Sequence, residues 1–169
     1  VVGGAVRDAI FASEDRPLKQ TDYDLATSAT PEQVEAIFGR SRTIPTGIRH
    51  GTVTVLFPGE IPSQIEITTF RNEGEYKDGR RPSLVSFLTD IVEDLKRRDF
   101  TVNAMAYDPI QGLLVDPFDG RKDLAAKQLK TVGDAKVRFK EDALRLLLVF
   151  CFVRRPGIST LSLYAAASV

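Results

Sequence analysis

The chain has 169 residues, enough for one domain with its own core, or for one domain and the start of another. Its 23 basic and 23 acidic side chains cancel, which argues against a nonspecific nucleic-acid binder with a basic surface throughout. The single cysteine excludes an intramolecular disulfide and a cysteine-rich zinc site, and it suits a reducing cytosol. The apolar run of residues 146–153 is too short to cross a bilayer, so no membrane partner is expected.

The chain opens on a glycine pair followed by a charged dipeptide, residues 2–8 (VGGAVRD). Glycine lets backbone amides approach a phosphate closely because no Cβ intervenes. If a helix begins at Ala5, its exposed N–H groups and its dipole favour an anion at the same place. The segment therefore predicts a loop that could hold a triphosphate, although a glycine pair also suits a simple turn.

An acidic pair, Asp22 and Asp24, follows on a strand predicted over residues 22–26. Side chains two apart on a strand face the same way, so both carboxylates would project together. Adjacent carboxylates repel unless a cation lies between them, and Mg²⁺ prefers oxygen ligands. The pair therefore predicts a metal site, with an ordinary solvated strand as the alternative.

Glu66 is a candidate third acid, on a strand predicted over residues 64–70 between Ile65 and Ile67. If the isoleucines face the core, Glu66 faces the opposite side of the strand. Three carboxylates converging there would form a two-metal clamp, which predicts metal-dependent nucleotidyl transfer. An exposed glutamate on an amphipathic strand is the alternative interpretation.

The remaining pattern alternates strands and helices and ends in helices. Thr30, Pro31 and Gln33 predict a capped helix that Gly39 ends. Further strands are predicted over residues 52–57, 100–107 and 113–115, and further helices over 5–12, 90–96, 122–126 and 136–150. Strands in the middle and helices at the end predict an α+β domain followed by a helical segment.

Five motifs, in this order, closely resemble those of the class II CCA-adding tRNA nucleotidyltransferases and the related bacterial poly(A) polymerases. They are residues 2–8 (VGGAVRD), 22–27 (DYDLAT), 65–71 (IEITTFR), 97–105 (RRDFTVNAM) and 141–145 (EDALR). The resemblance implies a polymerase-beta-like nucleotidyltransferase head, a mixed sheet flanked by helices, over residues 1–137. The start of a helical neck would follow over residues 138–169, atypical and truncated after about residue 147.

The same resemblance implies roles for individual residues. Asp22 and Asp24 would be the ligands of Mg²⁺, with Glu66 as the third catalytic carboxylate. The implied nucleotide-binding residues are Gly3, Gly4, Arg7, Arg98, Asp99, Asp142 and Arg145. Gly4 and Arg7 match phosphate contacts, Arg98 a nucleotide contact, and Asp99 lies in the segment associated with ribose recognition.

Asp142 and Arg145 match the pair that reads the Watson–Crick edge of CTP or ATP in that family. They are three apart and would be neighbours on the predicted helix. A carboxylate accepts from the exocyclic amino group that cytosine and adenine both carry, whereas uracil and guanine would leave it unpaired. An intrahelical surface salt bridge is the alternative.

Other positions bear on specificity and completeness. The family's neck carries arginines where this chain has Leu148 and Cys151, so we expect a truncated or altered ending with a weakened nucleotide pocket and weakened tRNA capture. Residues 72–82 resemble the flexible loop associated with switching from C to A addition, and residues 51–54 and 116–120 resemble CCA-adding members more than poly(A) polymerases. His50 is expected in a structural turn and not as a general base.

The expected function is addition of CMP and AMP from CTP and ATP to the tRNA 3′ end, with release of pyrophosphate. Three alternatives stay open. The first is a poly(A) polymerase, and the second is a non-catalytic remnant that binds nucleotide or a partner subunit. The third treats residues 22–24 as the metal motif of a glycosyltransferase that binds a nucleotide sugar, but it leaves residues 97–99, Asp142 and Arg145 unexplained.

Overall fold

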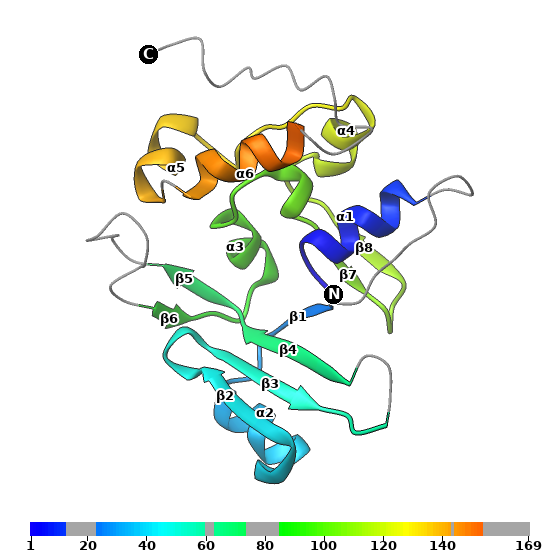
Figure 1. Cartoon of the computed structure of the whole chain (residues 1–169), viewed down its shortest axis with the longest axis vertical. Helices are drawn as coiled ribbons and strands as arrows, with labels where there is room; N and C mark the ends of the chain where they lie inside the picture. Colours follow the sequence, from blue (N-terminus) through cyan, green and yellow to red (C-terminus); the bar gives the residue numbers. More distant parts are fainter. Residues whose placement is uncertain (13–22, 60–62, 74–84, 143, 154–169) are drawn as a thin grey trace.

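A four-stranded mixed sheet lies toward one end of the molecule, in the strand order β1-β4-β3-β2, with α4, α5 and α6 toward the other end (Figure 1). The computed structural model describes residues 1–12, 23–59, 63–73, 85–142 and 144–153. The sheet strands are β1 (Asp24–Thr27), β2 (Thr43–Gly47), β3 (Thr52–Leu56) and β4 (Gln64–Thr69). β1 runs parallel to β4, and the other neighbours are antiparallel. The expected α+β class with a mixed sheet is confirmed.

Helix α2 (Pro31–Phe38) forms as the sequence predicts. The Thr30 side chain accepts a hydrogen bond from the Gln33 N–H, and the Gln33 side chain accepts one from the Thr30 N–H. This capping box satisfies two amides at the helix start that would otherwise lack a partner. Gly39 ends the helix with φ 83°, a conformation that favours glycine.

One face of the sheet packs against α2. The buried side chains between the sheet and α2 are all β-branched: Val34, Val53, Val55 and Ile67. Because strand side chains alternate between faces, the other face is left to polar residues such as Thr54 and Glu66. The face opposite α2 is therefore the one that can carry a site.

The rest of the chain forms two small hairpins and several short helices. These elements are α1 (Gly4–Phe11), η1 (Arg40–Arg42), η2 (Ile48–His50), β5 (Arg71–Glu73), β6 (Val85–Phe87), α3 (Ile91–Lys96), η3 (Thr101–Asn103), β7 (Ala106–Asp108), β8 (Leu113–Val115), α4 (Gly120–Ala125), α5 (Ala135–Glu141) and α6 (Leu144–Val153). β5 pairs with β6, and β7 pairs with β8. None of the helices in these described stretches is long and apolar enough to span a bilayer.

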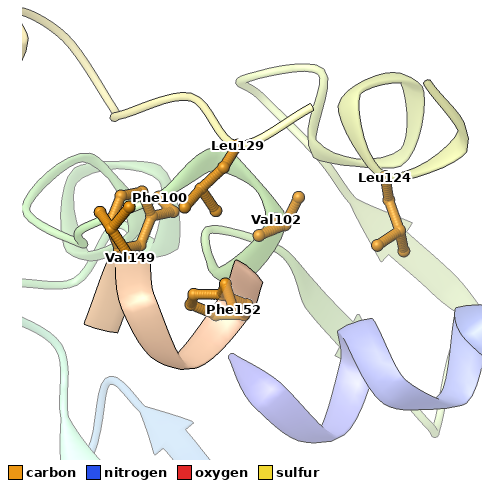
Figure 2. Close-up of a cluster of buried hydrophobic side chains, with 6 residues drawn as sticks. All are labelled: Phe100, Val102, Leu124, Leu129, Val149 and Phe152. Carbon is orange, nitrogen blue, oxygen red and sulfur yellow. The ribbon is translucent and has the colours of Figure 1, made fainter. Parts of the chain in front are cut away.

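A second hydrophobic core ties α6 to η3 and α4. Figure 2 shows its side chains, which are Phe100, Val102, Leu124, Leu129, Val149 and Phe152. The rings of Phe100 and Phe152 meet edge to face, with centroids 5.7 Å apart. The helix α6 is thus packed against the head through its buried side.

The predicted strand over residues 100–107 is wrong for its first part. Residues Thr101–Asn103 form the 3₁₀ turn η3, and only Ala106 onward is extended as β7. The carboxylate of Asp99 accepts the Phe100 N–H, and the Asn103 side chain donates to the same carboxylate. Such side-chain bonds to the nearby chain stabilise a turn in place of a strand ladder.

Candidate active site

Two of the acidic side chains predicted to be catalytic, Asp24 and Glu66, are positioned by strand register. Asp24 on β1 is the direct partner of Glu66 on β4, so both side chains leave the same face of the sheet. Both are exposed, while Ile67 on the next position turns into the core against α2. The predicted orientation of Glu66 relative to its flanking isoleucine is confirmed. Two carboxylates therefore lie side by side on the face opposite α2.

This pair suits a divalent cation chemically. Neighbouring strands are about 4.8 Å apart, so two ionised carboxylates directly opposite each other repel. A hard cation with a preference for oxygen ligands relieves that repulsion. Asp22 lies outside the described residues, and within the described ones no group of three His, Cys, Asp or Glu side chains is close enough to hold a metal. The fit to a metal therefore rests on Asp24 and Glu66.

The glycine turn lies directly beside the acidic strand. The Val2 N–H donates to the Asp24 carbonyl (3.0 Å), and the Gly3 N–H donates to the Met105 carbonyl (3.2 Å). Gly3 has φ 69°, and a Cβ placed there would lie 2.9 Å from Nη1 of Arg98. Glycine is required at this position by both its backbone conformation and the close guanidinium. Gly3, Arg98 and the strand of Asp24 are thus brought together.

Helix α1 begins at Gly4, and its first intrahelical bond runs from the Arg7 N–H to the Gly3 carbonyl (3.1 Å). The amides of Gly4, Ala5 and Val6 therefore precede the hydrogen-bonded ladder of the helix. Their N–H groups and the helix dipole make the start of α1 favourable for a phosphate. The helix predicted to start beside the glycine pair is present, and phosphate binding there stays a prediction.

Arg98 supplies a positive charge at the edge of this turn. Its Nη2 lies 3.5 Å from Oδ2 of the buried Asp94. Burial lowers the pKa of the Arg98 guanidinium, while the charges of Asp94, Asp99 and Asp24 act in the opposite direction. Arginine stays protonated in proteins, so Arg98 is a cation between the glycine turn and the acidic strand.

Arg7 is more enclosed than the motif suggests. Its side chain is 8% exposed, and both Nε and Nη2 lie 2.7 Å from Oδ1 of Asp8. Nη1 donates to Oδ1 of Asn103 (2.6 Å). The guanidinium also lies over the Phe152 ring, 5.1 Å from its centroid. These contacts fix the guanidinium between α1, η3 and α6.

Asn103 is a contact that sequence reasoning missed. Its Nδ2 donates to Oδ1 of Asp99 at 3.2 Å, and its Oδ1 faces Arg7. The only signal in the sequence is the position of Asn103 four residues after Asp99, within the motif of residues 97–105. A spacing of four residues brings the two side chains into contact here because η3 turns the chain back toward Asp99.

The expected base-reading pair does not lie on one helix. The helix predicted over residues 136–150 is confirmed as two helices, α5 and α6, but it is not continuous, because Asp142 between them is extended (φ −144°, ψ 109°). Its Oδ1 accepts the Leu144 N–H at 2.9 Å, a cap that aspartate favours. Residue 143 is outside the described residues.

Arg145 is buried at the start of α6 and is held by residues that the sequence reasoning had not assigned. Its Nη1 donates to Oε2 of Glu141 (2.7 Å) and to the Arg138 carbonyl (2.9 Å). Arg138 itself donates to Glu141 and, through Nη2, to the Lys96 carbonyl (2.7 Å). These bonds place α5 against the end of α3, just before the motif that contains Arg98.

His50, Leu148, Cys151 and the loop of residues 72–82 are the remaining predicted positions. His50 lies in the turn η2, where its carbonyl accepts from Arg71 Nη1, in keeping with a structural turn. Leu148 is partly exposed on α6, and the side chain of Cys151 is outside the described residues. Of the loop predicted over residues 72–82, only residues 72 and 73 are described, as part of β5.

Comparison with known proteins agrees with this geometry. A family model described as the poly A polymerase head domain matches residues 1–130, and the chain belongs to this family. A CCA-adding enzyme of Leuconostoc citreum is 49% identical over 156 residues, which cover 92% of this chain and 36% of that enzyme. A CCA-adding enzyme of Streptococcus uberis is 54% identical over 151 residues, covering 89% of this chain and 35% of the relative.

Solved structures give the same result. The Bacillus stearothermophilus CCA-adding enzyme in complex with CTP matches with a TM-score of 0.76 and 45% identity, over 92% of this chain and 34% of that one. The Thermotoga maritima CCA-adding enzyme complexed with tRNA matches with a TM-score of 0.65 and 27% identity, over 92% and 33%. The chain therefore spans roughly a third of the length of the proteins it resembles.

Proposed function

We propose that this chain is the catalytic head, with the start of the neck, of a CCA-adding enzyme. Residues 1–137 would form the head and residues 138–169 the beginning of the neck. The reaction would transfer CMP and AMP from CTP and ATP to the 3′ hydroxyl of tRNA and release pyrophosphate. The observation that carries the proposal is the register pairing of Asp24 with Glu66 beside the Gly3 turn. A cytoplasmic location would suit both this activity and the single cysteine.

The proposed cofactor is Mg²⁺, held by Asp22 and Asp24, with Glu66 as the neighbouring carboxylate. When bound, the divalent ions would lower the pKa of the attacking hydroxyl and neutralise charge on the triphosphate. The chain's own part is to bind and orient the nucleotide. Amides at the start of α1 would bind phosphate oxygens, and Arg98 would neutralise charge next to Gly3.

The proposed selection of cytosine and adenine rests on Asp142 and Arg145. Arg145 is held by Glu141 within the fold, so its guanidinium is oriented before a base arrives. Asp142 lies two residues before the Leu144 N–H that it caps, and binding of an exocyclic amino group would use its remaining acceptor positions. Preorganised hydrogen-bond partners penalise a base that cannot pair with them.

The test is incorporation from each of the four labelled nucleotides into tRNA that lacks its terminal CCA. The proposal expects incorporation of C and A in the presence of Mg²⁺, with products that stop after three added residues. A long run of adenosine would indicate a poly(A) polymerase. Binding of CTP in titration calorimetry without incorporation would indicate a non-catalytic nucleotide-binding remnant. Failure to bind any nucleotide would contradict all three.

A further inference from the structure

Arg138 on α5 bonds both to the chain around Arg98 and to the residues that support Arg145. We propose that Arg138 is a positioning residue that fixes the place of Arg145 relative to Arg98. The inference rests on the proposed nucleotide-binding function, in which Arg145 reads the base and Arg98 neutralises phosphate charge. Arg138 acts through Glu141 and Arg145 and not by touching the nucleotide, and its effect is on the selection of cytosine over uracil.

The guanidinium of Arg138 donates to three acceptors through three different nitrogens. Nε donates to the Val132 carbonyl (2.8 Å), Nη2 to the Lys96 carbonyl (2.7 Å) and Nη1 to Oε2 of Glu141 (2.9 Å). The side chain is only 17% exposed, so water competes weakly for these bonds. A planar guanidinium with five N–H donors can bond to acceptors on several sides, whereas a lysine ammonium is a compact point charge. The three contacts therefore match arginine better than any other cation.

Two of these acceptors lie on either side of the segment that carries Arg98. Lys96 is the last residue of α3, where carbonyls lack a partner within the helix and a cationic side chain can satisfy them. Val132 is 2% exposed, and its N–H donates to the Asp99 carbonyl (3.0 Å). The guanidinium of Arg138 is thus anchored to the backbone that leads into and out of Arg98.

The third acceptor joins Arg138 to the residue expected to read the base. Oε2 of Glu141 accepts from Arg138 and also from Nη1 of Arg145 (2.7 Å). The same Nη1 donates to the Arg138 carbonyl (2.9 Å), so residue 138 supports Arg145 through its side chain and its backbone. Because Asp142 is extended, no continuous helix carries Arg145 onward from α5. These bonds therefore set where the guanidinium of Arg145 lies.

A nucleotide that binds at both ends responds to the separation between the two sites. A base reader that can shift adapts to uracil, whereas a fixed reader leaves a badly matched base with unpaired polar groups. Arg138 connects the chain around Arg98 to Arg145, so it fixes the separation between the phosphate site and the base site. Such preorganisation raises the penalty for the wrong base and leaves the phosphate contacts as they are.

The experiment measures the dissociation constants of CTP and UTP by titration calorimetry with Mg²⁺ on the 169-residue chain. The ratio of the UTP constant to the CTP constant reports base selection, because the phosphate contacts are common to both ligands. Arg138→Met removes all three side-chain bonds, and Arg138→Lys keeps the charge. Arg40→Met is the matched control, since the Arg40 side chain is 89% exposed and its Nε faces Glu35 at 3.4 Å.

We expect Arg138→Met to lower the ratio by about 2–12-fold, the range for one hydrogen bond, with UTP binding nearly unchanged. Arg138→Lys should lower the ratio by a smaller factor, and Arg40→Met should keep the wild-type ratio. The double variant Arg138→Met, Glu141→Gln should lower the ratio no further than the stronger single variant. The reason is that both residues act on the same guanidinium of Arg145, and effects along one route are not additive.

Thermal unfolding of each variant shows whether the fold is intact. An unchanged ratio in Arg138→Met, or in Arg138→Lys where only that variant folds, overturns the inference alone. Equal weakening of CTP and UTP also overturns it, because Arg138 would then serve the stability of the fold only. Additive losses in the double variant overturn the route through Glu141 and Arg145. Equal binding of CTP and UTP by the wild type overturns the inference together with the proposed base selection, and absence of nucleotide binding overturns the proposed function as well.

Discussion

The β1–β4 pair and the α5–α6 pair both carry residues expected to meet the nucleotide, yet they fix them by different means. Between the strands, the backbone ladder places Asp24 beside Glu66. Between the helices, Asp142 lies in an extended link and Arg145 is held by Glu141. The two acids expected to be catalytic therefore depend on backbone register, whereas the expected base-reading residues depend on side-chain bonds and on how α6 packs.

The largest expected effect is on stability and comes from disrupting the packing of α6 against the head. Phe152→Ala removes a ring that is 6% exposed and that contacts Phe100 and Arg7, so we expect a loss of about 3–5 kcal/mol in the free energy of unfolding. Leu147→Ala on the same helix is the control, since Leu147 is 59% exposed. Its expected loss is within about 0.5 kcal/mol. Denaturant unfolding measures both, and equal effects would mean that α6 does not pack on the head.

Neutralising a carboxylate of the β1–β4 pair should lower activity but raise the stability of the fold, whereas Phe152→Ala lowers stability. Asp24→Asn should lower Mg²⁺-dependent incorporation by about 10²–10³-fold, the range for loss of one preorganised electrostatic group. In chelator without metal, the same variant should raise the free energy of unfolding by about 0.2–1 kcal/mol, because like charges opposite each other destabilise a sheet.

Two other aspartates are unsuitable as controls because their carboxylates accept backbone hydrogen bonds. Asp90 caps α3 by accepting the Val92 N–H, and Asp108 accepts the Ile110 N–H in the β7–β8 turn. Glu32→Gln is the control, since Glu32 is exposed and lies on α2, which packs on the other face of the sheet. The Thr30 side chain lowers the pKa of the Glu32 carboxyl, so neutralising this acid should cost a little stability instead of adding any. Lower stability of Asp24→Asn in chelator would argue against the repulsive pairing.

The same contrast explains what could be predicted from the sequence. Alternation between Ile65, Glu66 and Ile67 fixes the face of each side chain, so the orientation of Glu66 follows from a period of two. The capping box at Thr30 is likewise a local signal with a local cause. Both were correct because neighbours in sequence decide them.

Where a side chain bonds to the chain close by, the periodicity of the sequence was not sufficient. The apolar run after Asp99 resembles a strand, but the bonds of the Asp99 carboxylate close a turn there. The spacing of Asp142 and Arg145 suits a helix, but the Asp142 carboxylate caps a new helix at Leu144. In both places a short acidic side chain bonds to nearby amides, and periodicity alone does not register this competition.

The glycine turn beside β1 should be sensitive to the addition of a single Cβ atom at Gly3. Gly3→Ala should destabilise the fold by about 1–3 kcal/mol, because Gly3 has φ 69° and the new Cβ meets Nη1 of Arg98. Gly112→Ala is the matched control, since Gly112 has φ 66° but open space around its Cα. The difference between the two losses in thermal unfolding isolates the contact with Arg98. Equal losses would show that the guanidinium moves aside without cost.

The smallest expected loss of stability among the test variants concerns the support of Arg145. Glu141→Gln keeps the shape of the side chain but weakens the charge-assisted bonds that its Oε2 accepts from Arg138 (2.9 Å) and Arg145 (2.7 Å). We expect a loss of about 0.5–1.5 kcal/mol in the free energy of unfolding, the ordinary net worth of a hydrogen bond. Glu93→Gln is the control, because Glu93 faces Lys96 at 3.5 Å with both side chains largely exposed.

Nucleotide binding distinguishes a role of Glu141 in orienting Arg145 from a role in stability alone. If Glu141 orients the guanidinium for base reading, Glu141→Gln should reduce the preference for CTP over UTP in binding, while Glu93→Gln leaves it unchanged. A loss of stability with an unaltered CTP-to-UTP ratio would confine Glu141 to holding α5 against α6. In the strand pair, by contrast, the backbone ladder itself places Asp24 beside Glu66.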